Sequence, residues 1–383
     1  DGPADSAVDG DGATPLDASA SDGAVTDSGF DGGESPRDAG PTECPSVVDP
    51  ANVQLSTMDL GAVPIPMWVS TRSLTGSAPV GDRVVWTFTV PGQRNMVAWS
   101  DGGEPGRTQP QLNEQAPFVP VLPASADPDP NPNLPIGISS IIGVNDSEAL
   151  IFYSKLYILA PLAVGIARIA RDQSQAEVVR PLDLFPPAEE PAPGTLAWRP
   201  LYEAGPIIEQ TESGPLLYLY ACHSNPNVQE ENFGGLLVGP CRVGRVKLAD
   251  VADYRAYRHW NGSDWVDDPV QAVPVLSGVP GGLTVSFNRY LGKYLAVYSG
   301  SADNVMLRSA DRPEGPWATL GTFGTLPSDG TPGYSLAAAE HVALRDPCHR
   351  IIYVSYARVI GTTDETGAAV SLQESRMVRV ELK

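Results

Sequence analysis

The sequence predicts an all-β protein, a five-bladed β-propeller with a disordered acidic N-terminal tail. Short apolar runs typical of strands recur along the chain, each bounded by turn residues. Glycine and proline number 38 each, which favours many turns over long helices. With 383 residues, 42% of them hydrophobic, the chain has enough apolar material for a large core. The first 43 residues have a different composition, so we expect the propeller to span residues 44–383.

The tail, residues 1–43, consists mainly of Asp, Gly, Ala, Ser and Thr, with Arg37 as its basic residue. Such a segment buries too little apolar surface to offset its chain entropy, which predicts disorder. The DGDG run at 9–12 lacks the third oxygen ligand and the glutamate of an EF-hand loop, so a solvated spacer is the better interpretation. The chain begins with Asp1 rather than Met, from which we expect that a leader has been removed or omitted. The tail resembles the spacers that follow the lipid-modified cysteine of bacterial surface lipoproteins, although no such cysteine is present here.

A degenerate repeat predicts the blades. Its clearest copy reads LTVSF, the turn NRYLGK, the aromatic strand YLAVYS and the third strand VMLRSA, followed by DRPEGPW as a turn before an outer strand. Aligning this copy with the rest of the chain gives five first strands, expected at 84–90, 137–144, 206–210, 283–287 and 340–344. Helical periodicity is convincing only in VKLADVADYRAYRHW, which also fits a short turn plus a strand. A two-domain β-sandwich is the main alternative to the propeller.

Four cysteines permit three pairings, and the sequence alone does not choose among them. Cys222 and Cys241 flank one Pro/Asn/Gly-rich loop, where a local disulfide is natural, and Cys44 would then pair with Cys348. A metal site is the alternative, but adjacent Cys-His pairs point to opposite faces of a strand. Two disulfides favour an extracytoplasmic compartment, either secreted or on the outer surface of a bacterium.

The net negative charge of the chain indicates which classes of partner it can bind. The net charge is −21 and the pI about 4.4, which disfavours nucleic acid and anionic membrane surfaces. A neutral or cationic partner, such as an uncharged glycan or another cell-surface component, is compatible. No run of eighteen apolar residues exists, so no transmembrane segment is predicted. We expect a monomer.

Two short motifs carry a family resemblance. The segment SADRPEGPW resembles the blade-closing segment of five-bladed propellers of glycoside hydrolase family 43. The segment RVKLADVADYRAYRHWNGSDWV resembles a bacterial group called domain of unknown function 4185, whose blades end in an aromatic-Trp-Asn-Gly-x-x-Trp run. The family 43 resemblance implies an Asp base, an orienting Asp and a Glu acid on three blades, for which Asp101, Asp146 and Glu209 stand in chain order. For each carboxylate, a turn or surface role is the plainer interpretation.

Other residues are candidates for ligand contact near the axis of the propeller. Glu340 and His341 open an expected first strand, and Ser286 and Asn288 alternate along another. The resemblance gives His341 a second role, support of an axial cation such as calcium, although no cofactor is required and no metal site is assigned. The rings of Trp99, Trp198 and Tyr334 could stack on a sugar, where core packing is the alternative for each.

Two functions from different classes remain open. One is a carbohydrate-directed propeller that binds a neutral glycan at its axis and could also hydrolyse it, which requires two carboxyl groups on either side of one bond. The other is a non-catalytic surface scaffold or protein-interaction propeller. No serine-hydrolase elbow and no H-E-x-x-H motif occurs in the sequence.

Overall fold

The computed structural model describes residues 44, 48–63, 73–89, 95–102, 120–128, 130, 134–157, 160–183, 198–225, 239–279, 281–300, 303–325, 333–363 and 369–383. The chain separates into two units, Asp1–Asp31 and Gly32–Lys383, and all described residues belong to the second. The predicted disordered tail, residues 1–43, therefore lies outside the described residues.

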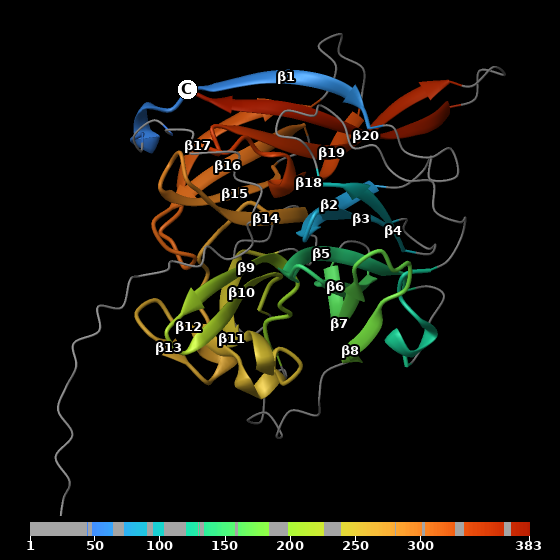
Figure 1. Ribbon diagram of the computed structural model, residues 1–383, viewed down its shortest axis with the longest axis vertical. Helices are drawn as coiled ribbons and strands as arrows, with labels where there is room; N and C mark the ends of the chain where they lie inside the picture. The colour runs from blue at the N-terminus through green and yellow to red at the C-terminus, as the bar shows by residue number, and fades with distance from the viewer. Residues whose placement is uncertain are drawn as a thin grey trace, which may run out of the picture. The chain divides into compact units, whose positions relative to one another are not determined.

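The described strands form five antiparallel sheets, the five blades of a β-propeller (Figure 1). Blade one holds β2 (Ser73–Val80), β3 (Arg83–Thr89) and β4 (Met96–Asp101), and blade two holds β5 (Ile136–Asn145), β6 (Glu148–Tyr157), β7 (Ala160–Ala170) and β8 (Glu177–Asp183). Blade three holds β9 (Ala204–Thr211), β10 (Gly214–Cys222), β11 (Cys241–Lys247), β12 (Arg258–Trp260) and β13 (Trp265–Val266). Blade four holds β14 (Gly281–Asn288), β15 (Lys293–Ser299), β16 (Asn304–Ala310) and β17 (Ala318–Gly324). Blade five holds β18 (Gly333–Glu340), β19 (Ile351–Thr363), β20 (Ala369–Leu382) and β1 (Leu55–Ala62).

Helical structure in the described residues is limited to single 3₁₀ turns: η1 (Pro50–Asn52), η3 (Ala124–Ala126), η4 (Leu248–Asp250), η5 (Tyr254–Ala256), η6 (Pro269–Gln271) and η7 (Val342–Leu344). The one stretch with helical periodicity contains η4, η5 and then β12, so the turn-plus-strand interpretation is the correct one. None of the helices described is long and apolar enough to cross a membrane.

Five hydrophobic cores hold the ring together, each between two neighbouring blades. Trp99 of blade one packs with Tyr153 of blade two, and Phe152 of blade two shares the next core with Leu219 of blade three. The remaining three cores join blade three to four, four to five, and five back to one. The aromatic second strands fill these cores because both faces of each blade are covered by a neighbour. The two-domain sandwich is thereby excluded.

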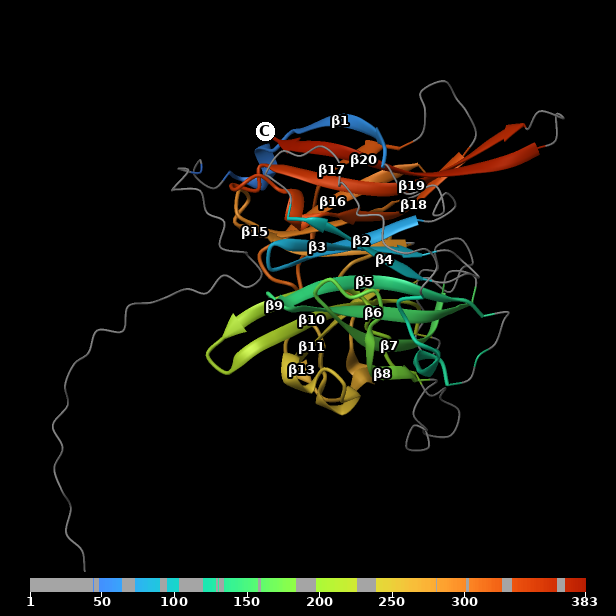
Figure 2. The same cartoon turned by 45° about the vertical axis from the view of Figure 1, so that its right-hand side comes forward.

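The first strands β2, β5, β9, β14 and β18 contact one another in that order, and β18 returns to β2 (Figure 2). Neighbouring first strands run in the same direction. Gly282 near the start of β14 lies against Ala337 of β18, whereas Ser286 near the end of β14 bonds Glu340 at the end of β18. All five first strands therefore begin at one end of the propeller axis and finish at the other.

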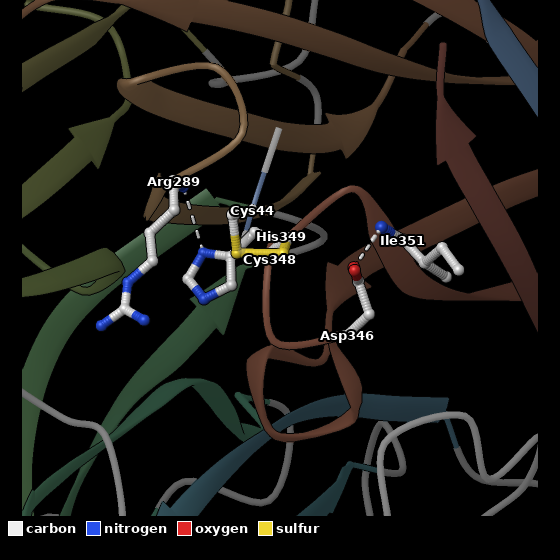
Figure 3. Close-up of a disulfide and its surroundings, with 6 residues drawn as sticks. All are labelled: Cys44, Arg289, Asp346, Cys348, His349 and Ile351. Atoms are coloured by element: carbon white, nitrogen blue, oxygen red, sulfur yellow. Dashed lines mark hydrogen bonds between the residues drawn. A yellow bond between two sulfur atoms is a disulfide. The ribbon is translucent and has the colours of Figure 1, made fainter. Parts of the chain in front are cut away.

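Segments from both ends of the described chain meet in blade five. The outer strand β1 pairs with β20 from Leu55 opposite Leu382 to Ala62 opposite Arg376, and the two lie side by side in both ribbon views (Figure 1). Ahead of β1, Cys44 forms a disulfide with Cys348, 304 residues away, in the turn that leads into β19 (Figure 3). The second disulfide joins Cys222 to Cys241, the end of β10 to the start of β11. The pairing favoured by loop position is thus the one formed.

Two predicted first strands were wrong. In blade one RVVWTFT is the second strand and MVAWSD the third, while SLTGSAPV is the first. In blade five the first strand GYSLAAAE ends at Glu340, and EHVAL continues into η7. Both true first strands are rich in small residues, because they pack closely around the axis, and small residues give a weak strand pattern.

Candidate functional site

Every first strand carries a β-bulge in its pairing with the second strand. Four of the register shifts lie on the first strands themselves: Leu74/Gly76, Ile138/Ser140, Gly281/Leu283 and Leu336/Ala339. The fifth, in blade three, is seen on the second strand between Tyr218 and Tyr220, which places the extra residue of β9 at Gly205. A bulge leaves one residue out of the alternation between the two faces and re-aims its side chain. We call the five bulge residues, Thr75, Ser139, Gly205, Gly282 and Ala337, the axial ring.

The residues of the axial ring are polar or small, and they differ in exposure, from the buried Gly205 to the exposed Gly282. Thr75 and Ser139 are partly exposed although both sequence neighbours of each are buried, and Gly282 is exposed. Gly205, Gly282 and Ala337 have φ values of 54°, 62° and 55°, which only glycine adopts readily. A Cβ on Gly282 would lie 2.8 Å from the Cα of Ala337, so the neighbouring strands need glycine there. The ring thus carries no large side chain.

One carboxyl group faces this ring. Glu203 immediately precedes β9, and the Ser139 hydroxyl donates a hydrogen bond of 2.7 Å to its Oε2. Ser139 also bonds Ser154 across 2.9 Å, and Ser140 donates to the main-chain oxygen of Glu203. Desolvation by burial raises the pKa of the Glu203 carboxyl, although the Ser139 and Ser154 hydroxyls act in the opposite direction. The oxygens of such a carboxyl group can accept hydrogen bonds from a ligand.

An exposed ring lies at the same end of the propeller. Tyr334, a predicted ligand contact, is the second residue of β18, and 49% of its surface is exposed. An aromatic ring left open beside polar groups is a typical sugar-stacking surface. Glu203 thus lies directly ahead of the first strand of blade three, and Tyr334 lies near the start of the first strand of blade five.

The structure does not bring the three predicted catalytic carboxylates together. Asp101 ends β4, the third strand of its blade, where it is exposed and paired with Arg83. Asp146 is exposed in the β5–β6 turn, with its main-chain oxygen beside Gly81. Glu209 lies on a first strand, but it faces blade four and accepts a hydrogen bond from the Tyr294 hydroxyl. The three side chains thus have separate surroundings, and none contacts Glu203 among the described residues.

Glu340, Ser286 and Asn288 are brought together at the opposite end of the axis, but as parts of a buried network. Ser286 donates to Glu340 Oε2 at 2.8 Å, and Arg345 Nε donates to Oε1 at 2.7 Å. The Asn288 amide donates to the main-chain oxygen of His349 at 2.9 Å and accepts from Leu291 N at 3.0 Å. Every polar group named here has a partner within the fold, so this network ties blade four to blade five.

His341 is enclosed in the core between blades five and one. Its Nδ1 and Nε2 lie 2.8 Å from the hydroxyls of Ser77 and Ser355, and its ring centroid is 5.0 Å from that of Trp86. Burial lowers the pKa of His341 to about 3, so the imidazole is neutral. Both nitrogens are engaged, so His341 does not fit the axial cation role that the resemblance gave it. No three His, Cys, Asp or Glu side chains gather as a metal site among the described residues.

Two of the predicted stacking rings are used for packing instead. Trp99 is buried in blade one and donates from Nε1 to the main-chain oxygen of Gln173 at 2.7 Å. Trp198 donates to Ser224 O at 3.0 Å, and the Arg242 guanidinium lies 4.9 Å from its ring centroid. Tyr334 alone of the three has a ring that solvent reaches freely.

The sequence analysis missed Glu203, Arg345 and His349. Glu203 lies in YEAGP, whose glycine and proline resemble a loop, and its importance arises only when Ser139 of another blade reaches it. A signal was nevertheless present, since a glutamate directly ahead of a first strand falls at the mouth of a propeller axis. Arg345 was recognisable only as a cation five residues after Glu340.

The fold defines the class: a five-bladed β-propeller. Residues 218–339, from blade three to the first strand of blade five, match the family model described as domain of unknown function (DUF4185). The resemblance inferred from RHWNGSDWV is thus confirmed over this part of the chain. No curated protein matches the sequence.

Several solved structures are similar in fold. An exo-β-1,3-galactanase from Phanerochaete chrysosporium, solved with β-1,3-galactotriose, is 13% identical, with a TM-score of 0.45 over 84% of this chain and 63% of the galactanase chain. An α-L-arabinofuranosidase from Podospora anserina, in complex with cellotriose, gives 10% identity and a TM-score of 0.44 over 86% of this chain and 96% of its own. A β-xylosidase gives 12% identity and a TM-score of 0.42 over 82% and 98%. This chain thus spans less than two thirds of the galactanase's length.

Proposed function

We propose that this protein is a carbohydrate-directed propeller that binds a neutral glycan at the end of the axis where the first strands begin. The observation that carries the proposal is the desolvated Glu203 carboxyl directly ahead of β9, which accepts a hydrogen bond from Ser139 of the neighbouring first strand. A carboxyl group is suited to hydroxyl-rich ligands because each of its oxygens can bond a sugar hydroxyl. The open ring of Tyr334 supplies an apolar face for stacking.

Location and assembly form part of the same proposal. Two disulfides favour an oxidising compartment, so we place the protein outside the cytoplasm, secreted or anchored to a bacterial surface. The glycan partner is then a component of a cell surface or of the surroundings. The propeller acts as a monomer and needs no metal or cofactor to bind the glycan.

The test is a glycan-array screen with wild-type protein, followed by affinity measurements on Glu203→Ala and Glu212→Ala. Glu212 is the matched control because it is an exposed glutamate in the β9–β10 turn. Loss of a charged hydrogen-bonding group weakens binding by about tenfold or more, so Glu203→Ala should lose affinity while Glu212→Ala keeps it. Equal affinities in the two variants, with both folded, would refute an axial site at Glu203.

The raised pKa of Glu203 also favours a second candidate function, glycoside hydrolysis with Glu203 as the acid. Hydrolysis needs a second carboxylate about 5–10 Å away. Reducing-sugar release from neutral polysaccharides tests this candidate in wild type, Glu203→Gln and Glu209→Gln. Cleavage that disappears in Glu203→Gln but persists in Glu209→Gln would support hydrolysis at the axial ring. If only Glu209→Gln abolishes cleavage, Glu209 is the acid, as the family resemblance implies. If the wild type binds a glycan but does not cleave it, the protein is a glycan-binding protein without hydrolase activity.

A further inference from the structure

The turn between β12 and β13 contains the one Asn-Gly pair of the sequence, Asn261-Gly262. Asn261 N donates a hydrogen bond of 3.0 Å to Asp264 O, which closes the turn between the paired residues Trp260 and Trp265. Asn261 is partly exposed and Gly262 is exposed, so water reaches the pair. The two strands form the outer edge of blade three, on the side away from its first strand.

The side-chain carbonyl of Asn261 is polarised by three donors of the same turn. Its Oδ1 accepts hydrogen bonds from Ser263 N at 3.0 Å, from the Ser263 hydroxyl at 3.1 Å and from Asp264 N at 2.8 Å. Donors gathered on one carbonyl oxygen stabilise the negative charge that develops there when a nucleophile attacks the carbon. The turn therefore makes the Cγ atom of Asn261 a better electrophile.

Gly262 supplies the adjacent nucleophile, its main-chain nitrogen. This N–H donates no hydrogen bond to any of the described residues. Gly262 has a φ of 100°, and because it lacks a Cβ the main chain can rotate its nitrogen towards Asn261 Cγ without a side-chain clash. The Nδ2 atom of Asn261 likewise has no partner within the part of the chain that the structure describes, so nothing holds it as a leaving group.

We propose that Asn261 is a site of spontaneous modification, at which Gly262 N attacks Asn261 Cγ and the side-chain amide leaves as ammonia. The N–Cγ bond forms while the Cγ–Nδ2 bond breaks, and the proton given up by Gly262 N leaves with the ammonia. Water then opens the resulting succinimide ring at either of its carbonyl groups, which gives aspartate or isoaspartate at position 261. The reaction consumes only water and involves no oxidation or reduction.

The products change the outer edge of blade three. Each places a carboxylate where the neutral amide stood, in a turn that already contains Asp264. Isoaspartate also adds a carbon to the main chain between Trp260 and Trp265, whose ring centroids lie 5.4 Å apart. Because β12 and β13 are joined by only two residue pairs, the added carbon should loosen their pairing. The site is independent of the proposed glycan site, which involves other residues of the blade.

The chain offers an internal control for the experiment. Asn145, in the β5–β6 turn, also accepts hydrogen bonds at Oδ1 from Ser147 N at 2.8 Å and from the Ser147 hydroxyl at 2.7 Å. It differs in being followed by Asp146, whose side chain hinders attack by the main-chain nitrogen, and in donating from Nδ2 to Glu148 Oε1 at 3.4 Å. Polarisation of the carbonyl is thus similar at the two sites, whereas the nucleophile and the leaving group differ.

The experiment incubates the full chain at mildly alkaline pH and follows both asparagines by peptide mass mapping, with fragmentation that separates aspartate from isoaspartate. We expect the amide of Asn261 to be lost at least about tenfold faster than that of Asn145, a difference of about 1.4 kcal/mol in activation free energy. The rate should rise with pH, because Gly262 N must give up its proton. Equal rates at the two asparagines, or no mass gain at Asn261, would overturn the proposal.

Two variants test the chemistry. Asn261→Gln keeps an amide but requires a larger ring, so its peptide should show no mass gain, and a gain at the wild-type rate would refute cyclisation through Gly262 N. Ser263→Ala removes one of the three donors to Oδ1 and should slow the reaction by about threefold to tenfold, the effect of one hydrogen bond. An unchanged or faster reaction in Ser263→Ala would overturn the role of the polarised carbonyl.

Discussion

Arg345 and Glu340 form an ion pair that is almost completely removed from water. Arg345 Nη2 lies 2.6 Å from Glu340 Oε1, and the side chains are 6% and 0% exposed. Arg345 also donates from Nη1 to Phe287 O at 2.9 Å, so the pair fastens the end of β18 to β14. A buried pair of this kind is costly to break because one charge stays behind without a partner.

We therefore expect Glu340→Gln to lower the free energy of unfolding by about 3–5 kcal/mol. The measurement is urea denaturation at neutral pH. The exposed pair of Arg258 and Asp267 is the control, and Asp267→Asn should cost about 1 kcal/mol or less. Equal losses in the two variants would mean that the Glu340 pair has no special structural role.

Three buried histidines give the protein a defined acid sensitivity. Burial lowers the pKa of His341 to about 3 and those of His223 and His259 to about 4. The unfolded chain binds these protons near pH 6.5, so it holds more protons than the fold does below that value. Stability should consequently fall as the pH drops from 6.5 towards 4, and thermal melts across this range measure the slope. His341→Gln should flatten the slope, and an unchanged slope would exclude His341 as a contributor.

The two disulfides should contribute unequally. In the chain-entropy model, cross-linking across 304 residues contributes about 6 kcal/mol and across 19 residues about 3 kcal/mol. We expect the Cys44→Ala/Cys348→Ala variant to unfold at a lower urea concentration than Cys222→Ala/Cys241→Ala. Matching denaturation curves would show that β1 holds blade five without the longer link.

A side chain added at Gly282 in the axial ring should lower the stability of the fold. Gly282→Ala places a Cβ 2.8 Å from the Cα of Ala337 at a φ of 62°, so a loss of about 2 kcal/mol or more is expected. Gly214→Ala separates the two causes, because Gly214 has a φ of 102° but no atom within 4 Å of the added Cβ. That control should cost only about 1 kcal/mol. Similar losses at both positions would mean that strand contact at the axis is unimportant.

The second strands were predictable because they are long apolar runs with aromatic residues, and LIFYSK, LLYLYAC and YLAVYS all occupy the expected place. The first strand of blade one was not, since its Gly76 and Ala78 serve contacts with blade two and give no alternation. Strand β1 was also missed, because its role in pairing with β20 depends on the ends of the chain meeting.

The candidate site was harder to predict than the fold, for a physical reason. The sequence does not show how far a carboxylate lies from the residues of other blades. Asp101 and Glu203 are therefore equally good candidates from the sequence alone. Glu203 stands out only through the Ser139 hydroxyl and the desolvation that accompanies it. Tyr334, predicted from its place near a first strand, does retain the open ring that a ligand contact requires.

The disulfide of Cys44 and Cys348 also determines how the molecule bears mechanical load. A pull on the chain ahead of Cys44 enters the propeller through a covalent bond to the turn before β19 (Figure 3). Without that bond, tension would reach β1 first and could peel it from the edge of blade five one hydrogen bond at a time. With the disulfide in place, the load passes to the turn before β19 and the hydrogen bonds between β1 and β20 do not carry it.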